Sequence, residues 1–319
     1  MYTVLIALLI FISAEPLTPQ STLEGHTAAV QQVTFSKDGK TLASASMDKT
    51  VKTWDMSTKK CITTLQSRDS VRCVAFSPIH RRLACGGGAF EVYLWDLDNP
   101  IQPVVLRQGG SDAVSLAFSP DGKTLALGSG SVSVSLWDVT TGRRKGALRS
   151  HAEDANVVVY SLDGKTIATG SVDKTIKLWD AETGKNIVTI MGNNDWVADL
   201  AFSPDGKLIA SCCKNSLSKI STDDHMMIKL WDTVTGKQIA VLVGHEDAVT
   251  SIAFSTNGKY LASGSRDRTI KLWDMSTRKV TNTIKAHADR VNSVAFSQDC
   301  KTLASGSADR TIKLWNIAQ

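Results

Sequence analysis

The sequence predicts an all-β fold in which seven repeats, each of about four short strands, close into a ring. A tryptophan marks each repeat, at Trp54, Trp95, Trp137, Trp179, Trp231, Trp273 and Trp315. The successive gaps are 41, 42, 42, 52, 42 and 42 residues, and a nearly fixed period of this size is typical of a repeat architecture. A four-stranded unit cannot bury both of its faces alone, so the repeats must pack side by side.

Each repeat reads as four strands, which we call a to d in chain order. Val30 to Phe35 alternates apolar and polar residues and is predicted as strand a. Asp38-Gly39 follows and predicts a tight hairpin in which both turn residues take positive φ. Residues 42–46 are strand b, the Trp-bearing segment is strand c, and residues 61–65 are strand d. Repeat seven has Asp299-Cys300 at the hairpin, a less favourable turn.

The repeats resemble the WD40 family over about residues 23–317. In the sixth repeat, Gly244-His245, Asn257-Gly258, Asp267 and Trp273-Asp274 stand in the family's order around two β-type segments. The resemblance implies an all-β, seven-bladed β-propeller of four-stranded antiparallel blades. It says little about function, because function lies in sites built onto the fold.

We expect residues 15–319 to form one domain and residues 1–14 to be a separate apolar segment. Residues 18–23 stand where strand d stands in the other repeats, so they are predicted to complete the last blade. Residues 3–13 are too short to span a bilayer, for which roughly 20 apolar residues are needed. They have the length of a signal-peptide core, but an uncleaved strand or the start of a longer protein's last domain fits as well. A cytoplasmic location is favoured, with secretion or membrane association as the alternative if residues 1–14 act as a signal.

The resemblance also implies a buried hydrogen-bonded network of His, Asp, a strand-b Ser or Thr, and the Trp indole. Four repeats carry its members: His26, Asp48 and Trp54; His151, Asp173 and Trp179; His245, Asp267 and Trp273; His287, Asp309 and Trp315. In the sixth repeat the hydroxyl is that of Ser263 or of Ser265. Repeats two, three and five have Ser67, Gly110 and Asn193 in place of the His, and Ala89, Ser131 and His225 in place of the Asp. Their blades are predicted to be less rigid.

Several function classes are disfavoured. The net charge of +5 is not gathered into a run, so nucleic acid is not an expected partner. A catalytic triad occurs once in a protein, whereas this His and Asp recur with the blade; only His80 and His225 lie outside the network. Cys212-Cys213 with the nearby Asp223, Asp224 and His225 lacks the usual zinc spacing. We predict no metal, no cofactor, no disulfide framework and no enzymatic activity.

Two features of the fifth repeat are absent from the other repeats. Trp196 is the one Trp outside the periodic series, at a position where other repeats have Ala29, Ser70, Ala113, Asp154 and Ala248. In the family this position faces the top rim, so Trp196 is a candidate interface anchor, unless it folds onto its own blade. The longer gap places about ten extra residues in the b–c connection, at 214–225, followed by Met226-Met227. They form either an adaptable binding loop or a tolerated insertion.

Other top-face positions follow from the family motif. Met47, Val172, Arg266 and Ala308 precede the b–c Asp, and Gln31, Arg72, Ser115, Ala198, Thr250 and Asn292 follow the strand-a Val. Arg72, Arg266 and Arg290 give this face a mildly basic character, which favours an acidic peptide as ligand. The predicted partner-binding residues are Trp196, Arg72, Arg266, Arg290, Met47 and Asp224.

These observations predict a non-catalytic scaffold, a monomeric ring that binds a protein or peptide on its top face. One alternative is the targeting or sensory module of a larger signalling complex. The other is an enzyme or small-molecule binder that uses the central channel. The inner strands read Ala-Ser-Gly-Ser and Ala-Phe-Ser and offer few titratable groups, which argues against the last alternative.

Overall fold

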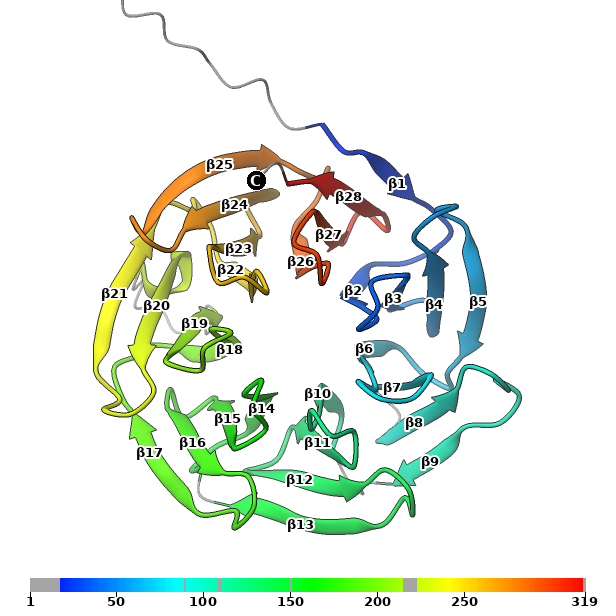
Figure 1. Cartoon of the computed structure of the whole chain (residues 1–319), viewed down its shortest axis with the longest axis horizontal. Coiled ribbons are helices and arrows are strands. Elements are labelled where there is room, and N and C mark those ends of the chain that lie inside the picture. The colour runs from blue at the N-terminus through cyan, green and yellow to red at the C-terminus, as the bar shows by residue number, and fades with distance from the viewer. Residues whose placement is uncertain (1–17, 89, 108–110, 150, 215–222, 318–319) are drawn as a thin grey trace, which may run out of the picture.

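Seven four-stranded sheets stand around a central channel (Figure 1). The computed structural model describes residues 18–88, 90–107, 111–149, 151–214 and 223–317. Adjacent strands within each sheet run antiparallel, as in β2–β3, β3–β4 and β4–β5. The predicted fold class, an all-β seven-bladed β-propeller with four-stranded blades, is therefore confirmed.

The strands take four positions from the channel to the rim, and we number the blades 1 to 7 in chain order. Strands a line the channel: β2 (Val30–Phe35), β6 (Val71–Phe76), β10 (Ala113–Phe118), β14 (Ala155–Tyr160), β18 (Trp196–Phe202), β22 (Val249–Phe254) and β26 (Val291–Phe296). Strands b follow: β3 (Thr41–Ser46), β7 (Arg82–Gly87), β11 (Thr124–Ser129), β15 (Thr166–Ser171), β19 (Leu208–Lys214), β23 (Tyr260–Ser265) and β27 (Thr302–Ser307).

The outer half of each blade carries the Trp-bearing strand and the rim strand. Strands c are β4 (Thr50–Asp55), β8 (Glu91–Asp96), β12 (Ser133–Asp138), β16 (Ile176–Asp180), β20 (Met227–Asp232), β24 (Thr269–Asp274) and β28 (Ile312–Asn316). Strands d are β5 (Cys61–Gln66), β9 (Val104–Arg107), β13 (Arg144–Arg149), β17 (Asn186–Ile190), β21 (Gln238–Val243), β25 (Lys279–Lys285) and, for blade 7, β1 (Ser21–Leu23). A short 3-10 helix, η1 (Asp223–Met226), precedes β20.

Blade 7 takes its rim strand from the other end of the described chain. β1 pairs antiparallel with β28, with Ser21 opposite Leu314 and Leu23 opposite Ile312. Leu23 is only 2% exposed and packs in one cluster with residues of blades 7 and 1. The ring is thus joined by three paired residues and one buried side chain.

The a–b hairpins differ from the predicted geometry at one residue. Only the glycine takes positive φ, as at Gly39 with φ 68°, while Asp38 does not. Asp38 Oδ1 instead accepts hydrogen bonds from Ser36 Oγ at 2.6 Å and from Lys40 N at 3.0 Å, which holds the turn through its side chain. In blade 7 Cys300 adopts the left-handed conformation, with φ 59°, that glycine occupies in the a–b turns of blades 1, 3, 4, 5 and 6.

Apolar side chains fill the spaces between neighbouring blades. Ile228 and Leu230 of blade 5 share a cluster with Leu261 of blade 6, and all three are fully buried. Burial of one such side chain stabilises a fold by roughly 1.5–3 kcal/mol. Because every blade repeats this contact with the next, the channel-lining strands are held in a fixed ring.

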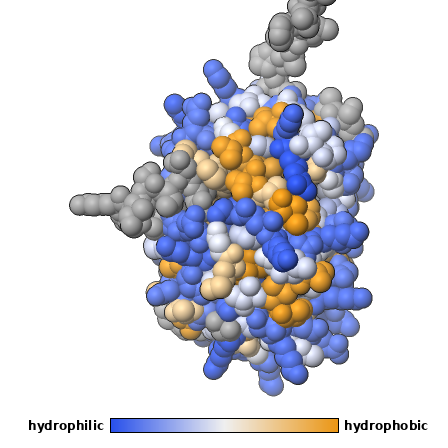
Figure 2. Space-filling view, turned by 90° about the vertical axis from the view of Figure 1, so that its left-hand side faces the viewer, coloured by the Kyte–Doolittle hydropathy of each residue, from blue (hydrophilic) through white to orange (hydrophobic). Residues whose placement is uncertain are grey.

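Apolar side chains also reach the outer surface. Figure 2 views the side of the ring that appears at the left of Figure 1, where β21 is the rim strand. Ile239, Val241 and Val243 of β21 are all exposed. No helix in the described part of the chain is both long and apolar enough to cross a membrane.

Candidate functional site

The His–Asp–Ser–Trp network is present in blade 6 with short hydrogen bonds. His245 Nδ1 lies 2.7 Å from Asp267 Oδ2, and His245 Nε2 lies 2.8 Å from Ser263 Oγ. The indole Nε1 of Trp273 donates to the same Ser263 oxygen at 2.8 Å. Ser263 is thus the strand-b hydroxyl of the network, whereas Ser265 donates to the backbone oxygen of Asp247 at 3.0 Å.

Blades 1, 4 and 7 repeat the arrangement. The equivalent sets are His26, Ser44, Asp48 and Trp54; His151, Thr169, Asp173 and Trp179; and His287, Ser305, Asp309 and Trp315. Burial lowers the pKa of His26 and of His151, against the opposing effect of the Asp partner. Although burial alone would raise it, hydrogen bonds from Thr175, the Ala152 N–H and His151 lower the pKa of Asp173 to about 2. Neutral imidazoles and ionised carboxylates fit a structural role.

The network histidines are closed to substrate. Their side chains are between 0% and 1% exposed. Of the two remaining histidines, His80 is exposed in the a–b turn of blade 2 and His225 lies in η1. Cys212 and Cys213 are buried in β19, and the six cysteines are free thiols. Within the described ranges, no three His, Cys, Asp or Glu side chains gather as metal ligands.

Blades 2, 3 and 5 lack the complete network, and each Trp is accommodated differently. In blade 2, Cys85 stands where the blades with the network have the hydroxyl, and Trp95 Nε1 is buried without a hydrogen-bond partner in the described structure. In blade 3, Trp137 donates to Ser135 of its own strand at 2.8 Å. In blade 5, Ser211 accepts from Trp231 at 2.8 Å and donates to Asn193 at 3.1 Å. Gly110 and Ala89, which we placed in this comparison, lie outside the described residues.

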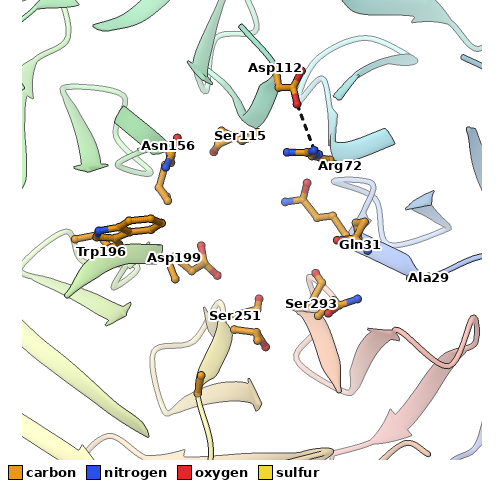
Figure 3. A pocket seen from close by; sticks show the side chains of 18 of the residues that line it. Ala29, Gln31, Arg72, Asp112, Ser115, Asn156, Trp196, Asp199, Ser251 and Ser293 are labelled. Atoms are coloured by element: carbon orange, nitrogen blue, oxygen red, sulfur yellow. Dashed lines mark ion pairs between the residues drawn. The ribbon is translucent and has the colours of Figure 1, made fainter. Parts of the chain in front are cut away.

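The channel opens into a cavity at the end of the ring where the inner strands begin, which we call the top face. The cavity has a volume of about 1140 Å³ and is lined by the first residues of the inner strands and by the b–c turns (Figure 3). Three large apolar side chains stand in this lining and are exposed: Met47, Phe90 and Trp196. Trp196 is 36% exposed, so it does not fold entirely onto its own blade.

Five of the six predicted partner-binding residues line this one cavity. They are Met47, Arg72, Trp196, Arg266 and Arg290. The sixth, Asp224, belongs to η1, but its side chain lies outside the described part of the structure, as do residues 215–222 of the extra loop.

The alignment of the third repeat was one residue out of register. Ala113 pairs with Ser129 as Val30 pairs with Ser46, so Ala113 occupies the strand-a Val position. The residue equivalent to Trp196 is therefore Asp112, and the residue after the Val position is Val114 and not Ser115. The cause is plain in the sequence, since Ala replaces Val at the first position of this strand.

The mouth of the cavity is not basic, contrary to our expectation. Its lining contains three arginines, Arg72, Arg266 and Arg290, and three aspartates, Asp112, Asp154 and Asp199. Arg72 Nη2 lies 3.2 Å from Asp112 Oδ2, so its charge is already paired (Figure 3). The aspartates come from blades 3, 4 and 5, whereas Arg266 and Arg290 come from blades 6 and 7. The two signs of charge therefore occupy different sides of the mouth.

Below the rim, side chains of the inner strands join neighbouring blades. Residues are counted here from the position of Val30 in each strand a, which is Val197 in β18. The third residue so counted accepts a hydrogen bond from the N–H of the fourth residue of the next strand a. These links are Ser293 to Val33 (3.1 Å), Gln32 to Val74 (2.8 Å), Ser115 to Val158 (3.1 Å), Asp199 to Ile252 (2.9 Å) and Ser251 to Val294 (3.2 Å). Among the described residues, Val157 makes no such link, and Cys73 instead contacts the next blade through its Sγ, which lies 3.5 Å from Ala113 O. The side chains that line the cavity wall thus also hydrogen-bond neighbouring blades to one another.

Sequence reasoning missed Phe90 and Asp199. Phe90 lies in the b–c turn of blade 2 and takes φ 55°, the left-handed turn conformation that Lys49 takes in blade 1. A bulky residue in that conformation is uncommon and was a usable signal. Asp199 is the one carboxylate at the third position of an inner strand, which comparison of the seven strands would have revealed.

The fold and the cavity define a closed propeller whose repeated polar groups are buried within the blades and whose top face carries an open cavity lined by exposed apolar and charged side chains. The profile of the WD40 repeat, described as "WD domain, G-beta repeat", matches residues 17–55, 59–96, 142–180, 184–232, 236–274 and 278–316. The chain belongs to the WD40 family, since these matches cover more than half of it. The stretch left unmatched, 97–141, contains β10, β11 and β12 of blade 3, where the network is absent.

Curated relatives match shorter stretches. The ribosome biogenesis protein YTM1 of Eremothecium gossypii is 42% identical over 79 residues, which are 24% of this chain and 18% of the relative. The ribosome biogenesis protein BOP1 homolog of Drosophila virilis is 44% identical over 71 residues, 21% of this chain and 9% of the relative. The match spans less than a fifth of either relative's length.

Proposed function

We propose that this protein is a non-catalytic interaction scaffold that binds a peptide or protein partner at the top-face cavity. The observation that supports it most is the exposure of Trp196, Met47 and Phe90 around one cavity of about 1140 Å³. Large aromatic side chains at the centre of an interface commonly dominate its binding free energy. The matched relatives, named for ribosome biogenesis, indicate the process in which the partner should be sought first.

The distribution of charge around the cavity indicates how the partner would be oriented. In the described structure neither the Arg266 nor the Arg290 side chain is within 4.0 Å of a carboxylate. An acidic group of the partner would face these two arginines, while Arg72 is held by Asp112. We therefore keep the expectation of an acidic partner group only for the side of the mouth that carries Arg266 and Arg290.

The test is partner capture followed by measured affinity. A pull-down with wild type and with Trp196→Ala, read by mass spectrometry, identifies candidates that only wild type retains. Isothermal titration with one such partner should show a loss of about 2 kcal/mol, roughly 30-fold, for Trp196→Ala. Arg266→Glu should slow association and reverse its salt dependence.

The matched control lies at the outer rim. Ile239→Ser removes an exposed apolar side chain from β21, far from the cavity in the ring (Figure 1). It should leave affinity unchanged. If Ile239→Ser weakens binding and Trp196→Ala does not, the partner binds the exposed strand of blade 5 and the top-face proposal is wrong. Removal of residues 215–222 tests the extra loop, and we expect weaker binding by a folded ring.

A further inference from the structure

Asp199 is an exception in the wall of the cavity. The third residues of the other inner strands are uncharged: Gln32, Cys73, Ser115, Val157, Ser251 and Ser293. None of these side chains brings a charge to the cavity, and the polar ones form hydrogen bonds between neighbouring blades. A serine suffices for that link at Ser251 and Ser293, so the link alone does not require a carboxylate at position 199.

The carboxylate of Asp199 is held in place by neutral donors. Oδ2 accepts the N–H of Ile252 at 2.9 Å, and Oδ1 accepts the N–H of Leu200 at 2.9 Å. The Ser251 side chain also hydrogen-bonds the carboxylate. No Lys, Arg or His in the described structure lies within 4.0 Å of it. Burial raises the pKa of Asp199 to about 6, although the side chain keeps partial contact with the open cavity. Its negative charge is therefore fixed in position but only partly compensated.

The surroundings of Asp199 suit a positive charge. Trp196 begins the same strand, β18, and Figure 3 shows Trp196 and Asp199 on the same side of the cavity. Asp154 of the adjacent blade 4 also lines the cavity, whereas Asp112 of blade 3 is paired with Arg72. An aromatic ring and a carboxylate together attract a cation through the ring's quadrupole and through charge. The nearest blade on the other side supplies Arg266 at the rim, above the layer of Asp199.

We propose that the cavity receives a cationic side chain, an arginine or lysine of the partner, with its charge on Asp199 and its stem against Trp196. This inference rests on the proposed function and specifies its ligand chemistry. The partner segment would then present a basic residue toward blades 4 and 5 and an acidic one toward Arg266 and Arg290. Complementary charges of this kind fix the direction in which a segment lies across an interface.

The experiment uses small probes, so it does not depend on the partner. N-acetyl-arginine amide, N-acetyl-lysine amide and the uncharged N-acetyl-citrulline amide are titrated into the full chain. Binding is followed by NMR through the indole N–H of Trp196 and the amide of Ile252. We expect saturable shifts with at least one cationic probe and binding about tenfold weaker or more for citrulline. The stronger of arginine and lysine identifies the preferred group.

The protein-side variant is Asp199→Ser, which keeps a hydroxyl acceptor for Ile252 as Ser251 does for Val294. It should reduce cationic-probe binding about tenfold or more while the spectrum stays that of a folded ring. Asp121→Asn, in the a–b turn of blade 3 at the opposite end of the inner strand, is the matched control and should have no effect.

The outcomes separate the two proposals. Equal binding of citrulline and arginine, absence of binding by all three probes, or unchanged binding in Asp199→Ser overturns the cation site. Loss of partner binding in Trp196→Ala alongside any of these results leaves the top-face function standing. Charge-selective probe binding together with unchanged partner affinity in Trp196→Ala supports the cation site and overturns the proposed function instead.

Discussion

Trp273 donates its indole hydrogen bond to Ser263 Oγ at 2.8 Å, and the same oxygen lies 2.8 Å from His245 Nε2. The Ser263 hydroxyl therefore connects the outer Trp strand with the histidine that precedes the inner strand. In blade 2 the corresponding pair is Trp95 and Cys85, and Trp95 Nε1 has no hydrogen-bond partner among the described residues. The two blades thus provide a natural comparison of one fold position with and without its hydrogen bond.

Trp273→Phe should destabilise the fold more than Trp95→Phe. Both changes remove the same atoms from a buried site, but only the first removes a hydrogen bond, the one that Ser263 Oγ accepts from Trp273. The expected difference in free energy of unfolding is about 1–3 kcal/mol. Urea unfolding of the two variants measures it. Equal losses would show that the network does not stabilise blade 6.

Leu23→Ala tests the closing strand. Leu23 is 2% exposed in the cluster between blades 7 and 1, so the change should cost about 2–5 kcal/mol. Thr22→Ala, on the exposed face of the same strand, should cost much less. Removal of residues 1–24 should expose the edge of β28 and promote aggregation, whereas we expect removal of residues 1–14 to leave the ring folded. A soluble monomer with unchanged melting temperature after the longer deletion would contradict this account.

The contribution of the network histidines to stability should fall as pH drops from 7 to 5, whereas Asp199, whose pKa burial raises to about 6, acts in the opposite direction. The pKa values of His26 and His151 are lowered in the folded protein, so in this range these two residues bind more protons in the unfolded chain and their protonation favours unfolding. His151→Asn copies the Asn193 of blade 5 and removes one titrating group. Its free energy of unfolding should therefore depend less steeply on pH than that of wild type, and chemical unfolding at a series of pH values tests this. Parallel curves for the two proteins would refute it.

Asp199→Ala should destabilise the junction between blades 5 and 6. The N–H groups of Leu200 and Ile252 would lose their acceptor, at a cost of about 1–3 kcal/mol. Asp199→Ser should recover part of this loss, because a serine makes the same link at the next junction. Thermal melts of both variants provide the measurement, and identical melting temperatures would mean that the link contributes nothing.

The repeated parts of the fold were predictable because they recur. Seven spaced tryptophans set the number of blades, and the His and Asp spacing placed the network, including its absence from blades 2, 3 and 5. The spacing left Ser263 and Ser265 undecided, because residues two apart on β23 point to the same face. They differ only in their position along the strand, and the motif does not say which one is level with His245 and Trp273. The positive φ predicted for Asp38 was wrong. The Asp38 side chain holds the turn through hydrogen bonds, and the Asp-Gly pattern alone does not reveal this.

The candidate site was less predictable because it depends on what differs between repeats. Trp196, Met47 and the arginines line one cavity, and their role in partner binding stays a prediction. The basic character was wrong, because the pairing of Arg72 with Asp112 joins two adjacent repeats and the third was misaligned by one residue. Phe90 and Asp199 stand out only when equivalent residues of all the blades are compared with one another.

The ring of links between inner strands also predicts where the propeller would break. Its ends are joined at blades 7 and 1 by Leu23, by Ser293 to Val33, and by the bond of Asn292 Nδ2 to Val30 O at 2.8 Å. Val157, by contrast, has no polar side chain to make this link to blade 5. The junction of blades 2 and 3 keeps other side-chain links, since Cys73 Sγ lies 3.5 Å from Ala113 O and Arg72 pairs with Asp112. Under mechanical load or mild denaturant, the ring should therefore split first between blades 4 and 5. The seam between blades 7 and 1 would outlast that junction.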